Sequence, residues 1–121
     1  MFEPNAIVFY VDNLALSSHF YQELFGFSPE VPSATFRCFK LSNGMLIGLK
    51  DKHAQGLSVD TNKGVELSFT VDNAKKVDEL FLTWQQKGIR IVEMPAMVSF
   101  GYTFIAIDPD GNRLRVISTG A

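Results

Sequence analysis

The chain has 121 residues, of which 46% are hydrophobic and 20% are charged, a balance typical of a soluble globular protein rather than a disordered or fibrous one. This length is enough for one domain with its own core and too short for two ordinary domains. The formal net charge is only -2 and the lysines and arginines form no basic run, which excludes nucleic acid as an expected partner.

The N-terminal stretch, MFEPNAIVFYVDN, has no basic segment before its short apolar run, and this predicts neither a signal peptide nor a membrane span. We therefore expect no membrane partner. Cys38 is the single cysteine, so no intramolecular disulfide is expected. Such cysteine usage suits a reducing compartment, and the predicted location is cytoplasmic.

The tripeptide VDN occurs twice, at residues 11–13 and 71–73, and the two copies have similar surroundings. Before each copy lies a run rich in β-branched and aromatic residues, at 6–11 and 65–71, which predicts a strand. The pattern indicates an internal repeat that covers most of the chain.

A helical pattern follows each copy, with its asparagine, Asn13 or Asn73, as the N-cap, because the side-chain oxygen can accept a hydrogen bond from a free backbone amide of the first turn. The second helix has an apolar stripe of helical period at Val77, Leu80, Phe81 and Trp84. The first helix has a shorter stripe at Leu16, Phe20 and Leu24. Gly26 and Gly88 are predicted to end the helices in the left-handed conformation.

Each half then closes with two strands around a glycine turn, over residues 35–50 and 102–117. Asn43-Gly44 and Asp110-Gly111, at the centres of these segments, are among the strongest hairpin signals that a sequence offers. Two hairpins of this kind predict that both halves end in antiparallel strands.

One more short extended piece is expected between helix and hairpin in each half, near residues 27–32 and 89–94. A loop is expected over residues 93–101. The predicted order is therefore strand, helix, strand, strand, strand, which occurs twice.

With these elements the chain resembles the vicinal oxygen chelate superfamily, which includes glyoxalase I, extradiol dioxygenases and bleomycin-resistance proteins. The residues that carry the likeness are VDNLALSSHFYQELFGF (11–27), VELSFTVDN (65–73) and FIAIDPDGNRLRVI (104–117). The resemblance implies an α+β fold in which two tandem βαβββ modules form a cup of curved mixed sheets. It implies one domain over residues 1–121, with module one at about 5–52 and module two at about 64–119.

In that superfamily the first and fourth strands of each module supply metal ligands, typically His, Gln or Glu. Carried over by register, these positions are Ala6 and Gly48 in module one, and Glu66 and Arg115 in module two. Alanine and glycine have no donor side chain, and a guanidinium is a permanent cation that repels a divalent ion. We therefore predict no metal and no other cofactor. Whether the chain is an enzyme stays open, and this ligand set favours a protein that is not one.

Glu66 and Arg115 would form a pair inside the cup if they lie on neighbouring strands, with Arg115 in the place of the metal. Arg115 would then bind Glu66 or an anionic group of a ligand. A purely structural ion pair is the simpler interpretation of one carboxylate and one arginine in a sheet. If the chain is an enzyme, the same two residues are the catalytic candidates, with Glu66 as general base and Arg115 stabilising a developing oxyanion.

Alternation along the strands assigns one face of each sheet to the helix and the other to the cup. The helix-facing residues are predicted to be Ile7, Phe9, Val11, Val65, Leu67, Phe69 and Val71. The cup face is predicted to carry Ala6, Val8, Tyr10, Arg37, Phe39, Leu46, Lys50, Glu66, Ser68, Thr70, Tyr102, Phe104, Arg113 and Ile117, with Met94, Met97 and Phe100 at the rim. The predicted ligand-binding residues are Tyr10, Arg37, Phe39, Glu66, Ser68, Met97, Phe100, Tyr102, Phe104 and Arg115.

The sequence favours a metal-free homodimer that binds a small aromatic molecule and sequesters it, as the bleomycin-resistance branch implies. Stacking and apolar burial would supply the affinity. The alternative is a lyase, isomerase or dioxygenase of the same superfamily, which either binds a divalent metal through other ligands or uses Glu66 as its base. A ligand-sensing module that acts on a partner protein is a third possibility that the sequence does not separate from the first.

Overall fold

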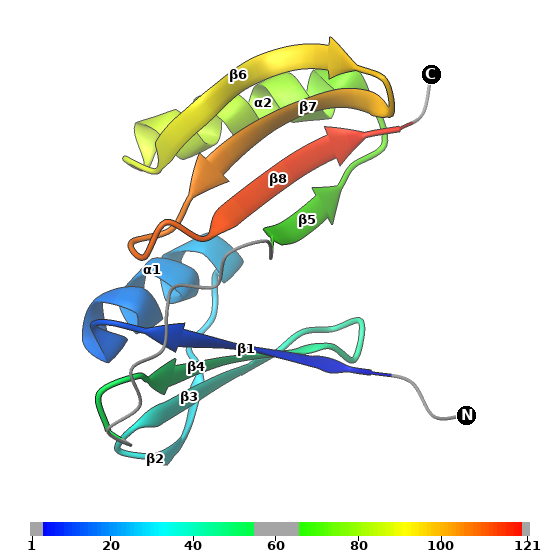
Figure 1. Ribbon diagram of the computed structural model, residues 1–121. Helices are drawn as coiled ribbons and strands as arrows, with labels where there is room; N and C mark the ends of the chain where they lie inside the picture. Colours follow the sequence, from blue (N-terminus) through cyan, green and yellow to red (C-terminus); the bar gives the residue numbers. More distant parts are fainter. Residues whose placement is uncertain (1–3, 55–65, 120–121) are drawn as a thin grey trace. The chain divides into compact units, whose positions relative to one another are not determined.

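A computed structural model describes residues 4–54 and 66–119 of the protein, drawn in Figure 1. The chain divides into two compact units, Met1–Asn62 and Lys63–Ala121, which contain module one and module two. Module one consists of β1 (Ala6–Val11), α1 (Leu14–Phe25), β2 (Glu30–Ser33), β3 (Phe36–Lys40) and β4 (Leu46–Asp51). Module two consists of β5 (Glu66–Thr70), α2 (Ala74–Gln86), β6 (Arg90–Val98), β7 (Gly101–Ile107) and β8 (Arg113–Ser118).

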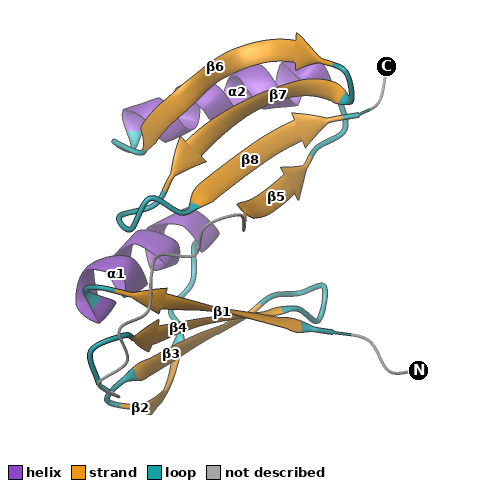
Figure 2. Ribbon diagram, in the orientation of Figure 1, coloured by secondary structure: helices purple, strands orange, loops and turns teal. Residues whose placement is uncertain are grey.

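Each module is a four-stranded mixed sheet with one helix. The strand order is β1-β4-β3-β2 in module one and β5-β8-β7-β6 in module two. The pairs β1 with β4 and β5 with β8 are parallel, whereas the other neighbours are antiparallel. The predicted α+β fold of two βαβββ modules is therefore confirmed, and Figure 2 shows the helix of module two covering one face of its sheet.

The helix ends follow the local sequence as predicted. The Leu16 amide donates to Asn13 Oδ1 at 3.0 Å, and the Lys76 amide donates to Asn73 Oδ1 at 2.9 Å, so each asparagine is an N-cap. Gly26 and Gly88, at φ of 84° and 79°, adopt the left-handed conformation that suits glycine after a helix. Local chemistry alone fixes where both helices begin and end.

The cores lie between each helix and its sheet. In β1, Phe9 and Val11 are buried as predicted, and in β5 Leu67 is buried while Phe69 packs edge-on against Trp84 of α2 at 5.5 Å between ring centroids. Val65, which was assigned to the same face, lies outside the described residues.

The apolar stripe predicted for the first helix was wrong at Leu16, while Phe20 and Leu24 are half-buried. Leu16 is 53% exposed, whereas α1 turns Leu14, Ser17, Ser18 and Tyr21 toward the sheet. Ser17 and Ser18 were missed because a count of apolar periodicity takes no account of residues that carry a hydroxyl group. The bulk of this core comes instead from Tyr21, which is fully buried.

The first hairpin has a three-residue loop over residues 42–44, because the Leu41 amide donates to the Met45 carbonyl oxygen at 2.8 Å. Gly44, the last loop residue, has a φ of 90°, as expected for a loop of this length. A two-residue loop would shift the pairing by one position, and such a shift moves every side chain of one strand to the other face. The assignment of Arg37 and Phe39 to the cup face was therefore wrong, since both lie on the helix side of β3.

The second hairpin repeats this geometry. The Asp108 amide donates to the Asn112 carbonyl oxygen at 3.0 Å, and Gly111 has a φ of 83°. The loop again contains three residues, 109–111, and the odd-numbered residues of β7 share a face with the odd-numbered residues of β8. The assignment of Tyr102 and Phe104 to the cup face was wrong for the same reason.

Two reassigned phenylalanines are core residues. Phe39 is fully buried and lies 6.4 Å from Tyr21 of α1 between ring centroids. Phe104 is fully buried and lies 5.4 Å from Trp84 of α2. The faces of the two sheets that point away from the helices consequently carry fewer aromatic residues than the sequence predicted.

Strand β6 replaces most of the loop that was predicted over residues 93–101. It is an edge strand with register shifts on both sides of Glu93, and it contains Pro95. Proline is tolerated at an edge or a bulge because it needs no amide partner there, and this is why a proline-containing segment can be a strand. Met97 pairs with Tyr102 on the helix side and is 73% exposed.

No helix within the described parts of the chain has the length and apolar character needed to cross a membrane.

Candidate functional site

The open face of module two, the sheet face that points away from α2, gathers the polar side chains that were expected in the cup. Strand pairing puts Ser68 of β5 and Ile105 of β7 on either side of Arg115. By alternation the same face carries Glu66, Ser68, Thr70, Thr103, Ile105, Ile107, Arg113, Arg115 and Ile117. Arg115 therefore lies on an inner strand, in the middle of this face.

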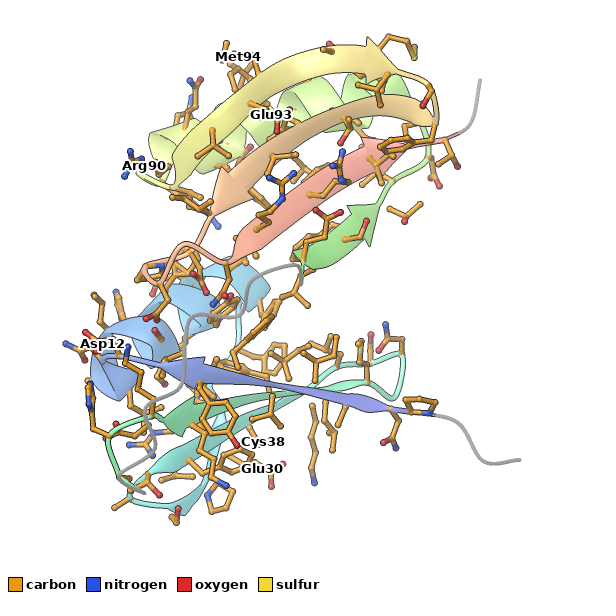
Figure 3. All side chains as sticks on the ribbon, viewed as in Figure 1. Asp12, Glu30, Cys38, Arg90, Glu93 and Met94 are labelled. Atoms are coloured by element: carbon orange, nitrogen blue, oxygen red, sulfur yellow. The ribbon has the colours of Figure 1, made fainter. Side chains whose placement is uncertain are left out.

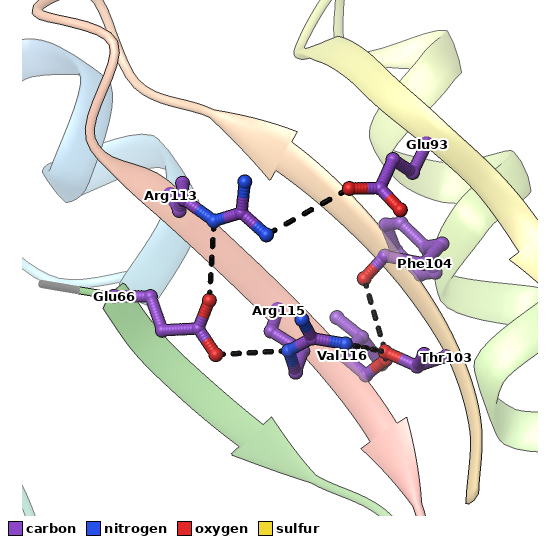
Figure 4. A network of polar contacts seen from close by, with 7 residues as sticks. All are labelled: Glu66, Glu93, Thr103, Phe104, Arg113, Arg115 and Val116. Carbon is purple, nitrogen blue, oxygen red and sulfur yellow. Dashed lines mark hydrogen bonds and ion pairs between the residues drawn. The ribbon is translucent and has the colours of Figure 1, made fainter. Parts of the chain in front are cut away.

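The Glu66 carboxylate bridges two guanidinium groups, as Figure 4 shows. Arg115 Nε donates to Glu66 Oε1 at 2.8 Å, and Arg113 Nε donates to Glu66 Oε2 at 3.3 Å. Arg113 Nη2 also lies 3.7 Å from Oε2 of Glu93, a residue of β6 that is labelled in Figure 3. The expected pair of Glu66 and Arg115 is present, and it belongs to a row of alternating charges that crosses the sheet.

Arg115 is held in one orientation by contacts on several sides. Its side chain is only 14% exposed, and its Nη1 donates to Thr103 Oγ1 at 3.1 Å. The Thr103 hydroxyl in turn donates to the Val116 carbonyl oxygen at 2.7 Å. The Arg115 Cζ atom lies 5.1 Å from the centroid of the Phe100 ring, which is within the range of a cation–π contact. The guanidinium is a preorganised, permanently charged group.

The Glu66 carboxylate is a weak base in this setting. Partial burial opposes its ionisation, but the hydrogen bonds and positive charges of Arg115 and Arg113 outweigh burial and lower the pKa of Glu66 below its usual 4.5. A general base works best when its pKa lies near the working pH. The two arginines therefore make Glu66 a poor proton acceptor at neutral pH and a good orienting anion.

Glu66→Gln is expected to lower the free energy of unfolding by about 1 kcal/mol at pH 7, because charge-assisted bonds to two arginines are replaced by weaker ones in a partly exposed position. Because the pKa of Glu66 is lower in the folded than in the unfolded protein, ionised Glu66 stabilises the fold fully above pH 4.5. This stabilisation is lost as the pH falls from 4.5 through the lower pKa of the folded protein. The difference between wild type and Glu66→Gln, measured by urea unfolding, should therefore shrink below pH 4.5.

Glu79→Gln is the matched control, since Glu79 forms an exposed pair with Lys76 at 3.7 Å on α2. This variant should follow the wild-type stability at every pH. A Glu66→Gln difference that grows on acidification would contradict the lowered pKa.

The residues at the four positions that correspond to the metal ligands of the superfamily do not fit a divalent ion. Ala6 and Gly48 offer no donor atom, and Arg115 contributes a fixed positive charge. The Glu66 carboxylate already accepts from two guanidinium groups. Within residues 4–54 and 66–119, no group of three or more His, Cys, Asp or Glu side chains is arranged to hold a metal.

The remaining predicted site residues are divided between the two sheet faces. Ser68 is exposed on the open face of module two, and Tyr10 lies half-buried on the open face of module one, beside Lys50. Tyr102 lies on the helix side, where its hydroxyl donates to Asp78 of α2 at 2.7 Å. Arg37 is on the helix side of β3 and donates to nearby backbone carbonyl groups.

Sequence analysis missed Thr103 as a site residue. Its hydroxyl orients Arg115, and it lies on the open face only because the second hairpin has a three-residue loop. The signal that could have found it is the odd-number pairing of β7 with β8, which becomes available once the loop length is known.

Comparison with known proteins gives consistent matches over nearly the whole chain. The family described as the Glyoxalase/Bleomycin resistance protein/Dioxygenase superfamily matches residues 4–116. The phenazine antibiotic resistance protein EhpR of Enterobacter agglomerans is 28% identical over 116 residues, which cover 93% of this chain and 89% of EhpR.

Two solved structures extend this likeness. A protein of Agrobacterium tumefaciens, determined by NMR in solution, is 42% identical with a TM-score of 0.88, and the match covers 100% of both chains. A glyoxalase/bleomycin resistance protein/dioxygenase family enzyme of Burkholderia phytofirmans is 23% identical with a TM-score of 0.79, over 95% of this chain and 97% of that one. At this identity the second likeness shows the fold alone.

Proposed function

Because this chain belongs to the glyoxalase/bleomycin resistance protein/dioxygenase superfamily, we propose that it is a metal-free member that binds and sequesters a planar aromatic small molecule. The observation that carries this proposal is the contact of Arg115 with Phe100, in which a fixed guanidinium lies 5.1 Å from the centre of a ring that is 54% exposed. The likeness to a phenazine antibiotic resistance protein suggests the ligand class. Phenazines are flat fused aromatics whose ring nitrogens accept hydrogen bonds.

The open face of module two would bind such a ligand by stacking and by donated hydrogen bonds. The exposed Phe100 ring offers a surface on which a flat aromatic can stack. The Arg113 side chain is 44% exposed, and the Ser68 hydroxyl lies on the same face, so both can donate to a ring nitrogen. Glu66 keeps Arg115 oriented, and affinity would come from a rigid site that loses little entropy on binding.

The donor set of this chain supports the metal-free part of the proposal. Among the four positions that correspond to metal ligands, only Glu66 has a carboxylate, and both of its oxygens already accept hydrogen bonds from arginines. The enzyme alternative with Glu66 as general base is disfavoured because those arginines lower its pKa. Sequestration needs neither a metal nor a proton acceptor.

We further propose that the protein acts as a cytoplasmic homodimer. The single cysteine, Cys38, suits a reducing compartment. Closed symmetric dimers are the commonest oligomers of small soluble proteins.

Isothermal titration of phenazine into EDTA-treated protein tests the proposed function. Wild type is expected to bind, and Phe100→Ala should weaken binding about tenfold, because a stacking contact contributes about 0.5–1.5 kcal/mol and 1.4 kcal/mol is one decade in Kd. Leu82→Ala, which truncates an apolar side chain that is 56% exposed on α2, is the matched control and should bind as wild type does. Light scattering on the same sample should give twice the 13.5 kDa chain mass.

The outcomes separate the two classes of function. Absence of phenazine binding, or binding that EDTA abolishes, would contradict a metal-free aromatic-binding protein. If wild type and Phe100→Ala bind phenazine equally strongly, the ligand does not bind at Phe100 and Arg115.

A further inference from the structure

Module one has at Gly48 the position that Arg115 occupies in module two. Gly48 is the third residue of β4 and pairs with Val8 of β1, just as Arg115 is the third residue of β8 and pairs with Ser68 of β5. The two positions lie on the open faces of their own sheets. Module one therefore has bare backbone where module two has a guanidinium.

The Phe36 ring fills the space that a side chain at Gly48 would need. A Cβ atom added to Gly48 would lie 2.9 Å from the Cε1 and Cζ atoms of Phe36 and 3.2 Å from the Cγ2 atom of Val8. Gly48 is not among the glycines with positive φ, so its backbone conformation does not require glycine. The physical reason for a glycine here is that it lets the Phe36 ring lie on the sheet.

In module two the positions that correspond to Gly48 and Phe36 are Arg115 and Thr103, which form a hydrogen bond. Phe36 pairs with Lys50, and its counterpart Thr103 pairs with Ile117 in the corresponding register. Thr103 accepts from Arg115 where Phe36 covers Gly48. One diagonal of the sheet is thus polar and charged in module two, and aromatic in module one.

The surroundings of Phe36 are apolar with one cation. Val8, which touches the Gly48 position, is 43% exposed, and Phe36 itself is half-buried. Lys50, next to Phe36 in the neighbouring strand, lies on the same face and is half-buried. It forms no ion pair with the residues that the structure describes.

We propose that the open face of module one is a second aromatic-binding surface, on which a planar aromatic anion places its ring over Phe36 and its anionic substituent at Lys50. A flat ring on a flat, partly exposed surface gains by stacking and by burial of apolar area. An ammonium group that forms no ion pair within residues 4–54 and 66–119 selects a carboxylate or a similar anion. This inference rests on the proposed function and adds to it a surface that prefers acidic aromatics.

A double-mutant cycle tests the geometry without any ligand. Gly48→Ala should lower the Tm by several degrees in wild type, because the added methyl group must displace the Phe36 ring. In a Phe36→Ala background the same substitution should cost little, since the ring is gone. An equal loss of Tm in both backgrounds would overturn the placement of the ring on Gly48.

Titrations with phenazine and phenazine-1-carboxylate test the surface itself. Each compound should bind wild type at two sites per chain, and Phe36→Leu should weaken one of them about tenfold, whereas Lys50→Met should weaken that site only for the carboxylate, by a similar factor. Phe36→Tyr keeps the ring and should retain binding. Val31→Ala, at a 61% exposed position of β2, is the control and should change neither titration.

The results distinguish this inference from the function on which it rests. If wild type binds neither compound, the proposed function fails. If wild type binds both compounds, and Phe100→Ala weakens them while Phe36→Leu does not, only the second surface is refuted. Equal loss of both compounds in Lys50→Met would refute the selection for an anion.

Discussion

Phe104→Ala is expected to lower the free energy of unfolding by about 3–5 kcal/mol, the largest effect of any single substitution considered for this protein. The Phe104 side chain is fully buried, and its ring contacts Trp84 and Phe81 of α2 at 5.4 and 5.6 Å between centroids. Truncation removes two aromatic contacts between helix and sheet and leaves a cavity that rigid strands cannot close. Urea unfolding followed by far-ultraviolet circular dichroism measures this loss.

Phe100→Ala is the matched comparison, because Phe100 has the same side chain and is 54% exposed. Its effect on stability should stay within about 0.5 kcal/mol, while its effect on aromatic binding should be large. The two variants together test which face of the sheet each phenylalanine occupies. If Phe104→Ala had normal stability and lost ligand binding, Phe104 would belong to the ligand site, and the observed register would be wrong.

Asp108→Ala is expected to cost about 2–4 kcal/mol, because it leaves buried donors without an acceptor. The Asp108 carboxylate accepts from the Asp110 amide at 2.9 Å and from the Asn112 amide at 2.8 Å. Its second oxygen accepts from Asn112 Nδ2 at 2.8 Å. Asn112 is only 3% exposed, so water cannot fully replace these bonds. Urea unfolding again measures the effect.

Asp72→Ala provides the control, since Asp72 is exposed in the segment before α2. It should leave stability nearly unchanged. Asp108→Asn should recover much of the loss, because an amide oxygen still accepts from the backbone. If Asp108→Ala were as stable as Asp72→Ala, the hairpin loop would not depend on this carboxylate, and the register of β7 with β8 would need another cause.

Local features of the fold could be predicted because they depend on a few neighbouring residues. The asparagine caps and the glycines that end the helices are of this kind, as are the positions of the hairpins. The order of elements in the two βαβββ modules followed from the repeat. These features needed no knowledge of tertiary contacts.

The faces of the hairpin strands could not be predicted in the same way. Asn43-Gly44 and Asp110-Gly111 each mark a turn, but they do not say whether the loop has two or three residues. That single residue decides whether Phe39 and Phe104 face the helix or the open side. The helices carry aromatic residues on the side that faces the sheet. If Phe39 and Phe104 had been expected to pack against them, the observed register would have been favoured.

The candidate site was predictable in its centre and not in its surroundings. Glu66 and Arg115 were found because a family position and strand alternation both pointed to them. Arg113 was assigned to the correct face, but its bond to Glu66 was missed, although Arg113 lies directly opposite Glu66 in the parallel pairing of β5 with β8. The Phe36 ring was missed because its significance comes from the missing side chain at Gly48, and a glycine in a strand has several explanations.

Each sheet in this protein has one face that packs on its own helix and one that does not. For evolution this separates two kinds of residue. Substitutions on the helix side damage packing. On the other side, corresponding positions of the two modules carry a glycine in one and a guanidinium in the other, and both modules keep a core between helix and sheet. A duplicated module can thus acquire a new chemistry in one copy while the other keeps its own. Such freedom helps to explain how one architecture came to serve glyoxalases, dioxygenases and resistance proteins alike.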